Sequence, residues 1–232
     1  MNDLAQTTQF KTLIQPLLAD VDQATRAHLT NDRLLIPLIA MAVQGQTNLI
    51  QAQTRSAFEA GIKPEKILEV IYQLSPIIGI TKVLAAVEQI NLTFEQLKRV
   101  VQEPIAQESD HFGAEVQAKL YGTEIKQLLK DLPDNAGQFI SEMLTQHFFN
   151  DFYRRSELSV KERERFELLA LIALNVDFQI KAHARGSLKA GNTEAELIWS
   201  IVQLLPYIGF PLVINSVQLV HQAGQALASE AK

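Results

Sequence analysis

Cysteine is absent from the 232-residue chain. Its absence excludes thiol nucleophiles, disulfide exchange, Cys-ligated zinc and Cys-ligated iron–sulfur clusters. Thiol peroxidase chemistry is therefore excluded.

Glycine and proline are scarce, with 10 and 8 copies. Few turns are therefore expected, and no stretch shows sustained alternation of apolar and polar residues. The 47% hydrophobic and 20% charged contents are ordinary for a globular protein. These features together predict an all-α fold.

Clustered basic residues are also missing, and the net charge is −5. Three glutamates interrupt the most cationic stretch, residues 153–165. Nucleic acid is not an expected partner, because phosphate contacts need grouped Lys and Arg. No apolar run approaches the ~20 residues of a membrane helix, and the first residues do not resemble a signal peptide. We expect a cytoplasmic protein with no membrane partner.

A repeat organises the chain. Residues 60–90 align without a gap on residues 190–220, at an offset of 190 − 60 = 130, and ten of the 31 positions are identical. The identities keep Gly and Pro in register, which shared composition alone would not do. We predict two related halves, a degenerate repeat in residues 1–100 and a second repeat in 101–232.

Two capping boxes mark helix starts in the second half. Ser159 precedes Glu162 by three residues, and Thr193 stands in the same relation to Glu196. The helix after Ser159 is nearly all apolar and should be buried. The helix after Thr193 is expected to end before Pro206, because the residue before a proline avoids helical angles.

His183 is the first candidate for chemistry. A lone histidine on a partly apolar helix is usually structural. Three features favour a role: Lys181 and Arg185 flank it, a helix end stands close behind it at Gly191, and the aligned position in the first half is Gln53.

Glu164 and Glu167 lie early in the preceding helix. Carboxylates favour that end for dipole reasons alone, but one of them can also orient an imidazole across antiparallel helices. We expect a direct hydrogen bond from His183 to Glu164, with Glu167 as the alternative. Asp32 is taken as the corresponding acid of the first half.

Tyr207 and Asn215 carry polar groups near the last helix, and we expect them to line a small-molecule pocket with His183. The other histidines (His28, His111, His147 and His221) are interpreted as surface or packing residues. His147 and Asp151 have i, i+4 spacing, but two ligands do not make a metal site. No metal is expected.

The second half resembles the carboxymuconolactone decarboxylase family, which includes the alkylhydroperoxidase D-like proteins. The shared pattern begins with Arg163 and Glu164 and continues through the histidine helix, "KAHARGSLKAG", and the Thr193 cap. It ends in "PYIGFP" with a following Asn at 215. The resemblance covers about residues 110–228, and the first half matches weakly.

The resemblance implies an all-α fold of tandem repeats, a small-molecule substrate, no cofactor, and homo-oligomers. A chain of two repeats would form a trimer, whose six repeats make a pseudo-hexamer. Members of the peroxidase branch carry Cys-x-x-Cys, which is missing here, so the decarboxylase branch is the better match.

That branch implies a lyase acting on a small carboxylated lactone. His183 would move a proton and Glu164 would orient it, while Arg185 or Arg154 would bind a substrate carboxylate and Tyr207 and Asn215 would line the pocket. The alternative is a non-enzymatic binding or assembly protein, in which His183 need not face a cavity beside a carboxylate.

Overall fold

The computed structural model describes residues 8–102 and 112–230, and all regular elements in these ranges are helices. The predicted all-α fold is confirmed. Within these ranges, no helix combines the length and apolar character needed to cross a bilayer. His111 lies outside the described residues.

The first half contains a series of mostly short helices. They are α1 (Thr8–Arg26), η1 (Asn31–Leu35), α2 (Ile36–Gln44), η2 (Thr47–Leu49), α3 (Ile50–Glu59), α4 (Pro64–Tyr72), α5 (Ser75–Ile78) and α6 (Ile80–Gln96). Pro37 lies in the first turn of α2, and Pro64 opens α4, where a missing amide proton costs least.

The second half begins with a lead-in and continues with four longer helices. The lead-in is α7 (Phe112–Tyr121), α8 (Glu124–Leu129), η3 (Pro133–Asn135), α9 (Ala136–Met143) and the π-helix η4 (Leu144–Asn150). The longer helices are α10 (Val160–Leu174), α11 (Asp177–Lys189), α12 (Glu194–Ile208) and α13 (Phe210–Glu230).

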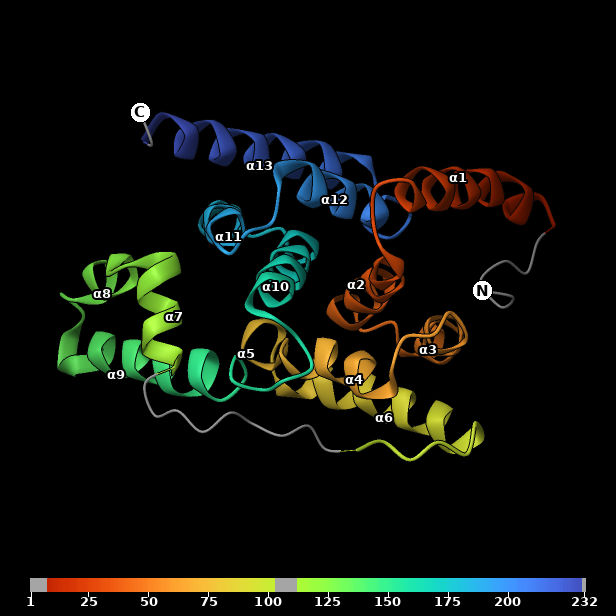
Figure 1. Cartoon of the computed structure of the whole chain (residues 1–232), viewed down its shortest axis with the longest axis horizontal. Helices are drawn as coiled ribbons and strands as arrows, with labels where there is room; N and C mark the ends of the chain where they lie inside the picture. The colour runs from red at the N-terminus through yellow and green to blue at the C-terminus, as the bar shows by residue number, and fades with distance from the viewer. Residues whose placement is uncertain (1–7, 103–111, 231–232) are drawn as a thin grey trace.

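Helix α10 lies near the centre of the molecule (Figure 1) and packs against α2, α5, α11, α12 and α13. Every residue of α10 from Arg163 to Ile172 is buried, so the burial predicted from the apolar second part of the helix also extends to four charged residues. One buried cluster joins apolar residues of both halves, so the halves share a core. The elements that place α10 therefore also place its few polar side chains.

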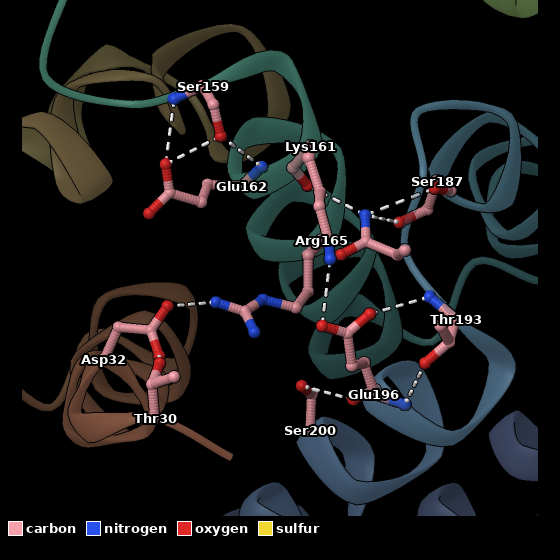
Figure 2. Close-up of polar contacts among 11 residues, drawn as sticks. Thr30, Asp32, Ser159, Lys161, Glu162, Arg165, Ser187, Thr193, Glu196 and Ser200 are labelled. Atoms are coloured by element: carbon pink, nitrogen blue, oxygen red, sulfur yellow. Dashed lines mark hydrogen bonds and ion pairs between the residues drawn. The ribbon is translucent and has the colours of Figure 1, made fainter.

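Both predicted capping boxes are present. The Ser159 hydroxyl accepts from the Glu162 amide, and the Glu162 carboxylate accepts from the Ser159 amide. Thr193 and Glu196 repeat this exchange at the start of α12 (Figure 2). The caps satisfy amide groups that the first turn would leave without partners.

The expected end of α12 before Pro206 is wrong. The helix continues through Pro206 to Ile208 and ends at Gly209, where φ is +80°. Proline removes one amide donor from the helix, but its fixed φ is helical. Helix α12 packs against α1, α2 and α13, and the Gln44 side chain donates to the Tyr207 carbonyl in its last turn at 2.8 Å. At the aligned position Pro76, by contrast, the chain is split into α4 and α5.

Backbone breaks recur at the offset of 130 residues. Gly61 and Gly191 have φ of +88° and +99°, and Gly79 and Gly209 have φ of +88° and +80°. These positive angles favour glycine, which accounts for its recurrence in the alignment. The matched breaks agree with the predicted repeat, which remains a prediction.

A buried ion-pair network joins the two halves. Glu69 on α4 is fully buried and pairs with Arg163 at 2.9 Å and with Arg155 at 2.8 Å. Asp32 also reaches across: it pairs with Arg165 on α10 (Figure 2). Asp32 is therefore the partner of an arginine, and the offset aligns it with Glu162, contrary to the expected match with Glu164.

Replacing Glu69 by alanine should lower the free energy of unfolding by about 3–5 kcal/mol, because Arg163 would stay buried without a counter-charge. Guanidinium unfolding measures the loss. The matched control is Arg26→Ala, which removes an exposed pair with Asp22 and should cost at most about 1 kcal/mol. Equal small losses in the two variants would contradict the role given to Glu69.

Candidate acid–base site

Three elements bring an imidazole, a phenol and a carboxylate together. His183 comes from α11, Tyr121 from the end of α7 and Glu164 from α10. The Tyr121 hydroxyl lies 2.5 Å from Glu164 Oε2 and 3.0 Å from His183 Nδ1. His183 Nδ1 and Glu164 Oε2 are 3.7 Å apart. The expected direct hydrogen bond is therefore absent, and Tyr121 bridges the two groups.

A second tyrosine joins Glu164 to Glu167. The two glutamates are three residues apart on α10, so their side chains lie on one face of the helix. The Tyr153 hydroxyl is 2.6 Å from Glu164 Oε1 and 2.7 Å from Glu167 Oε2. A hydroxyl has one proton to donate, so one of these contacts must receive its proton from a carboxyl group. The geometry favours one proton on the glutamate pair.

Burial shifts the pKa of each titratable group in this cluster. Both glutamate side chains are fully buried. Burial raises the pKa of Glu164 to about 7, and burial together with the Glu164 charge raises that of Glu167 well above its usual range. Burial lowers the pKa of His183 to about 4. Near neutral pH the imidazole is therefore uncharged, while a proton is available on the carboxyl pair.

The chain from Glu164 through Tyr121 to His183 has two neutral-imidazole arrangements. When Glu164 is ionised, Tyr121 donates to it and Nδ1–H of His183 donates to Tyr121. When Glu164 is protonated, it donates to Tyr121, Tyr121 donates to Nδ1, and the imidazole proton is on Nε2. When protons move along the chain and one proton is gained or lost at Nε2, the tautomer of His183 changes and the ring stays uncharged.

Gly186 makes room for this chain on α11. A Cβ atom at this position would lie 2.5 Å from the Tyr121 hydroxyl and 2.9 Å from Glu164 Oε2. Glycine inside a helix costs about 1 kcal/mol relative to alanine. Here the missing side chain lets the phenol approach the carboxylate.

His183 lies in the wall of a pocket of about 700 Å³. Its apolar wall includes Phe148, Phe149, Phe178 and Leu144, and Tyr121 also lines it. About 15% of the His183 side chain is exposed, and no described residue hydrogen-bonds to Nε2. Nε2 is thus the nitrogen left to meet a ligand. An apolar cavity with few converging polar groups is the usual form of a small-molecule site.

The structure places the predicted substrate-binding residues unequally. Arg185 lies beside the pocket, in a smaller adjoining hollow. Arg154, Tyr207 and Asn215 line neither space. In the described part of the chain, Tyr207 and Asn215 therefore do not share the His183 pocket, contrary to the expectation.

The position of Tyr207 has a simple cause. The end of α12 packs on the first half, where the Gln44 side chain donates to the Tyr207 carbonyl at 2.8 Å. Burial and the nearby Asp22 charge raise the pKa of Tyr207 to about 12. Ile77, which aligns with Tyr207, packs against the main core and also against the cluster of Phe148, Phe149 and Tyr153. Asn215 lies exposed on α13.

The sequence analysis missed Tyr121, Tyr153 and Gly186. Tyr121 stands in "LYG", where the glycine indicates a helix end, and Tyr153 opens the cationic stretch of residues 153–165, which was considered only for its charge. A signal did exist at Gly186, because a glycine within a helix often marks a close approach of another group.

The first half lacks the equivalent cluster. At the offset of 130 residues, Leu34, Pro37 and Gln53 align with Glu164, Glu167 and His183. The Gln53 side chain donates to the Leu34 carbonyl at 2.8 Å, which satisfies it within the fold. These residues cannot exchange protons as their counterparts can.

The same cluster contains the residues that can hold a metal ion. Ligand atoms of Glu164, Glu167 and His183 lie within 4.8 Å of one another. Tyr121 and Tyr153 already hydrogen-bond to these atoms. A bound cation would have to replace those hydrogen bonds.

The other histidines in the described residues have structural partners. His28 stacks on Trp199 with ring centroids 3.9 Å apart. His147 pairs with Asp151 at 2.8 Å, and the Nδ1 atom of His221 lies 2.7 Å from Glu194.

Comparison with known proteins identifies part of the chain. The model of the carboxymuconolactone decarboxylase family matches residues 140–222. The matched segment contains Glu164, Glu167 and His183, whereas Tyr121 precedes it. No curated protein matches the chain.

Gly186→Ala should destabilise the protein and break the contact from Tyr121 to Glu164, because the new methyl group would occupy the space of the phenol. Thermal unfolding and the ultraviolet absorption of tyrosine test both effects. The control is Gly224→Ala on α13, where the nearest atoms belong to the end of the half-exposed Glu194 side chain. That side chain can move, so this variant should keep its stability or gain up to about 1 kcal/mol. Similar behaviour of the two variants would contradict the role of Gly186.

Proposed function

Because residues 140–222 belong to the carboxymuconolactone decarboxylase family, we propose that this chain is a cofactor-free lyase acting on a small carboxylated lactone. The observation that carries the proposal is the Tyr121 hydroxyl between Glu164 and His183, at 2.5 and 3.0 Å. It gives a buried proton source a hydrogen-bonded route to an imidazole in the pocket wall. The sequence holds no cysteine, so thiol peroxidase activity stays excluded.

The reaction needs a proton where charge develops. In decarboxylation, the bond between the ring carbon and its carboxylate breaks, CO₂ leaves, and the electron pair enters the conjugated lactone as an enolate. The Nε2–H of His183 then protonates carbon. Tyr121 passes a proton to Nδ1 and receives one from Glu164, which later regains its proton from water.

The relay explains how a histidine with a lowered pKa can deliver a proton. A free imidazolium is unfavourable at this buried position. In the relay the imidazole gains a proton at Nδ1 while it loses one at Nε2, so charge does not accumulate on the ring. Glu164, whose pKa lies near neutrality, supplies the proton and takes the negative charge. Glu167 and Tyr153 act as positioning residues because they hold Glu164.

The walls of the pocket also suit the loss of CO₂. The lining contains no lysine or arginine among the described residues. A carboxylate placed there loses water without gaining a cation, and its conversion to neutral CO₂ relieves that penalty. The same apolar pocket is also compatible with the alternative, a small-ligand binding protein without turnover.

Tyr121→Phe should lower the rate of CO₂ release from a responsive γ-carboxylated lactone about 10²–10⁴-fold, because the ring stays but the relay is cut. His183→Asn should have a similar effect. Tyr207→Phe, which removes a hydroxyl outside the pocket, is the control and should keep the rate. Ligand binding to the unmodified chain without CO₂ release from any lactone of a panel would favour the binding-protein alternative.

We also propose that the chain assembles into a trimer. Exposed apolar residues occur at matched positions of the two halves: Ile80 and Phe210, and Leu84 and Ile214, are 56–67% exposed. They lie on the first turns of α6 and α13. Such apolar surface favours association, and its repetition gives each chain two equivalent faces.

Light scattering after gel filtration should therefore give a mass of three times 25.9 kDa, about 78 kDa. Placing lysine at both Leu84 and Ile214 should shift the mass towards 25.9 kDa, because charge would be buried at the contact. Val100→Lys changes an apolar residue that is 89% exposed outside the helices and is the control. A monomer of the unmodified chain would exclude the trimer.

A further inference from the structure

A smaller hollow of about 190 Å³ adjoins the main pocket. The two spaces share wall residues Tyr121, Glu124, Phe178 and Ala182. Tyr121 belongs to the proton relay, so a ligand that fills both spaces passes beside His183.

The two spaces differ in charge. Lys181, Arg185 and Lys189 line the smaller hollow at intervals of four residues, and so share one face of α11. The main pocket has no lysine or arginine among its described lining residues, and its surface is mostly aromatic and aliphatic. An anionic group is therefore stabilised in the small hollow, and an apolar ring in the large pocket.

Arg185 is held only weakly by the protein. Its guanidinium lies 3.8 Å from Glu124 and 3.5 Å from Glu230, and both carboxylates are more than half exposed. Such surface pairs contribute about 0–1 kcal/mol. The Arg185 Nε atom is buried without a hydrogen-bond partner in the described structure. A ligand carboxylate can displace these weak pairs and accept two parallel hydrogen bonds from Arg185.

We propose that Arg185 and Lys181 form an anchor for one ligand carboxylate, separate from the place of chemistry, and that the ligand is a small acid with an apolar ring. The anchored carboxylate is not the one lost as CO₂, because the group that reacts must lie near His183 in the main pocket. This inference rests on the proposed function, since it names the substrate class of the same site.

Glu124 opposes the anchor in this arrangement. It lines both spaces and pairs with Arg185. A ligand carboxylate must compete with it and lie near its charge. Neutralising Glu124 should therefore strengthen the binding of acids and leave the binding of neutral ligands unchanged.

The test compares phenylacetate with phenylacetamide, which has the same ring but no charge. Binding is measured by ¹⁵N–¹H NMR titration of the whole chain. Phenylacetate should bind at least tenfold more tightly, Arg185→Gln should abolish that preference, and Arg185→Lys should retain part of it. Glu124→Gln should raise phenylacetate affinity severalfold. Lys126→Gln removes a cation on α8 that lines neither space and is the matched control.

Equal binding of the acid and the amide, no binding of either, or an acid preference that survives Arg185→Gln would overturn the anchor. These results do not depend on turnover. An acid preference lost in Arg185→Gln, together with no CO₂ release from any lactone, would sustain the anchor and reject the proposed lyase. CO₂ release without an acid preference would sustain the proposed lyase and reject the anchor.

Discussion

Two carboxyl groups buried side by side impose the main constraint on this structure. Glu164 and Glu167 are fully buried on α10, and ionised carboxylates are costly in such a place unless they are paired or share a proton. Two tyrosine hydroxyls, a neutral imidazole and the charge of Arg163 surround the pair. Arg163 lowers the pKa of Glu167, but the opposite effect of burial is stronger. Arg163 is itself buried and depends on Glu69 from the other half. The site therefore depends on the packing of both halves around α10.

The sequence predicted the fold better than it predicted the site. Local signals sufficed for the capping boxes and for the burial of α10, because these depend on neighbours in the chain. The proximity of His183 and Glu164 also followed from antiparallel helices. Tyr121 could not be predicted, because it arrives from a lead-in 62 residues before His183, and its place depends on how α7 docks on α11. Tyr207 was misplaced for a related reason: the end of α12 packs on the other half, a tertiary contact with no local pattern.

The two halves have glycines with positive φ at two matched positions but differ in chemistry. Where the second half has two acids and a histidine, the aligned positions of the first half have Leu34, Pro37 and Gln53. The Gln53 side chain donates a hydrogen bond to a backbone carbonyl. Its amide is uncharged and does not titrate. This difference agrees with a first half that supports the core while the second half holds the site. Glu69 illustrates that support, because it stabilises the helix that carries both glutamates.

The most direct measurement is a ¹³C NMR titration of the glutamate side-chain carboxyl groups, assigned with Glu164→Gln and Glu167→Gln. The account predicts that Glu164 titrates near pH 7, against ~4.3 for an ordinary glutamate, so that the buried pair keeps a proton at pH 6. Because this folded-state pKa is raised, its contribution to stability should be full below about pH 4.5 and lost as the pH rises through 7. If both carboxyl groups ionise near pH 4, no proton is stored beside Tyr121, and the relay is contradicted.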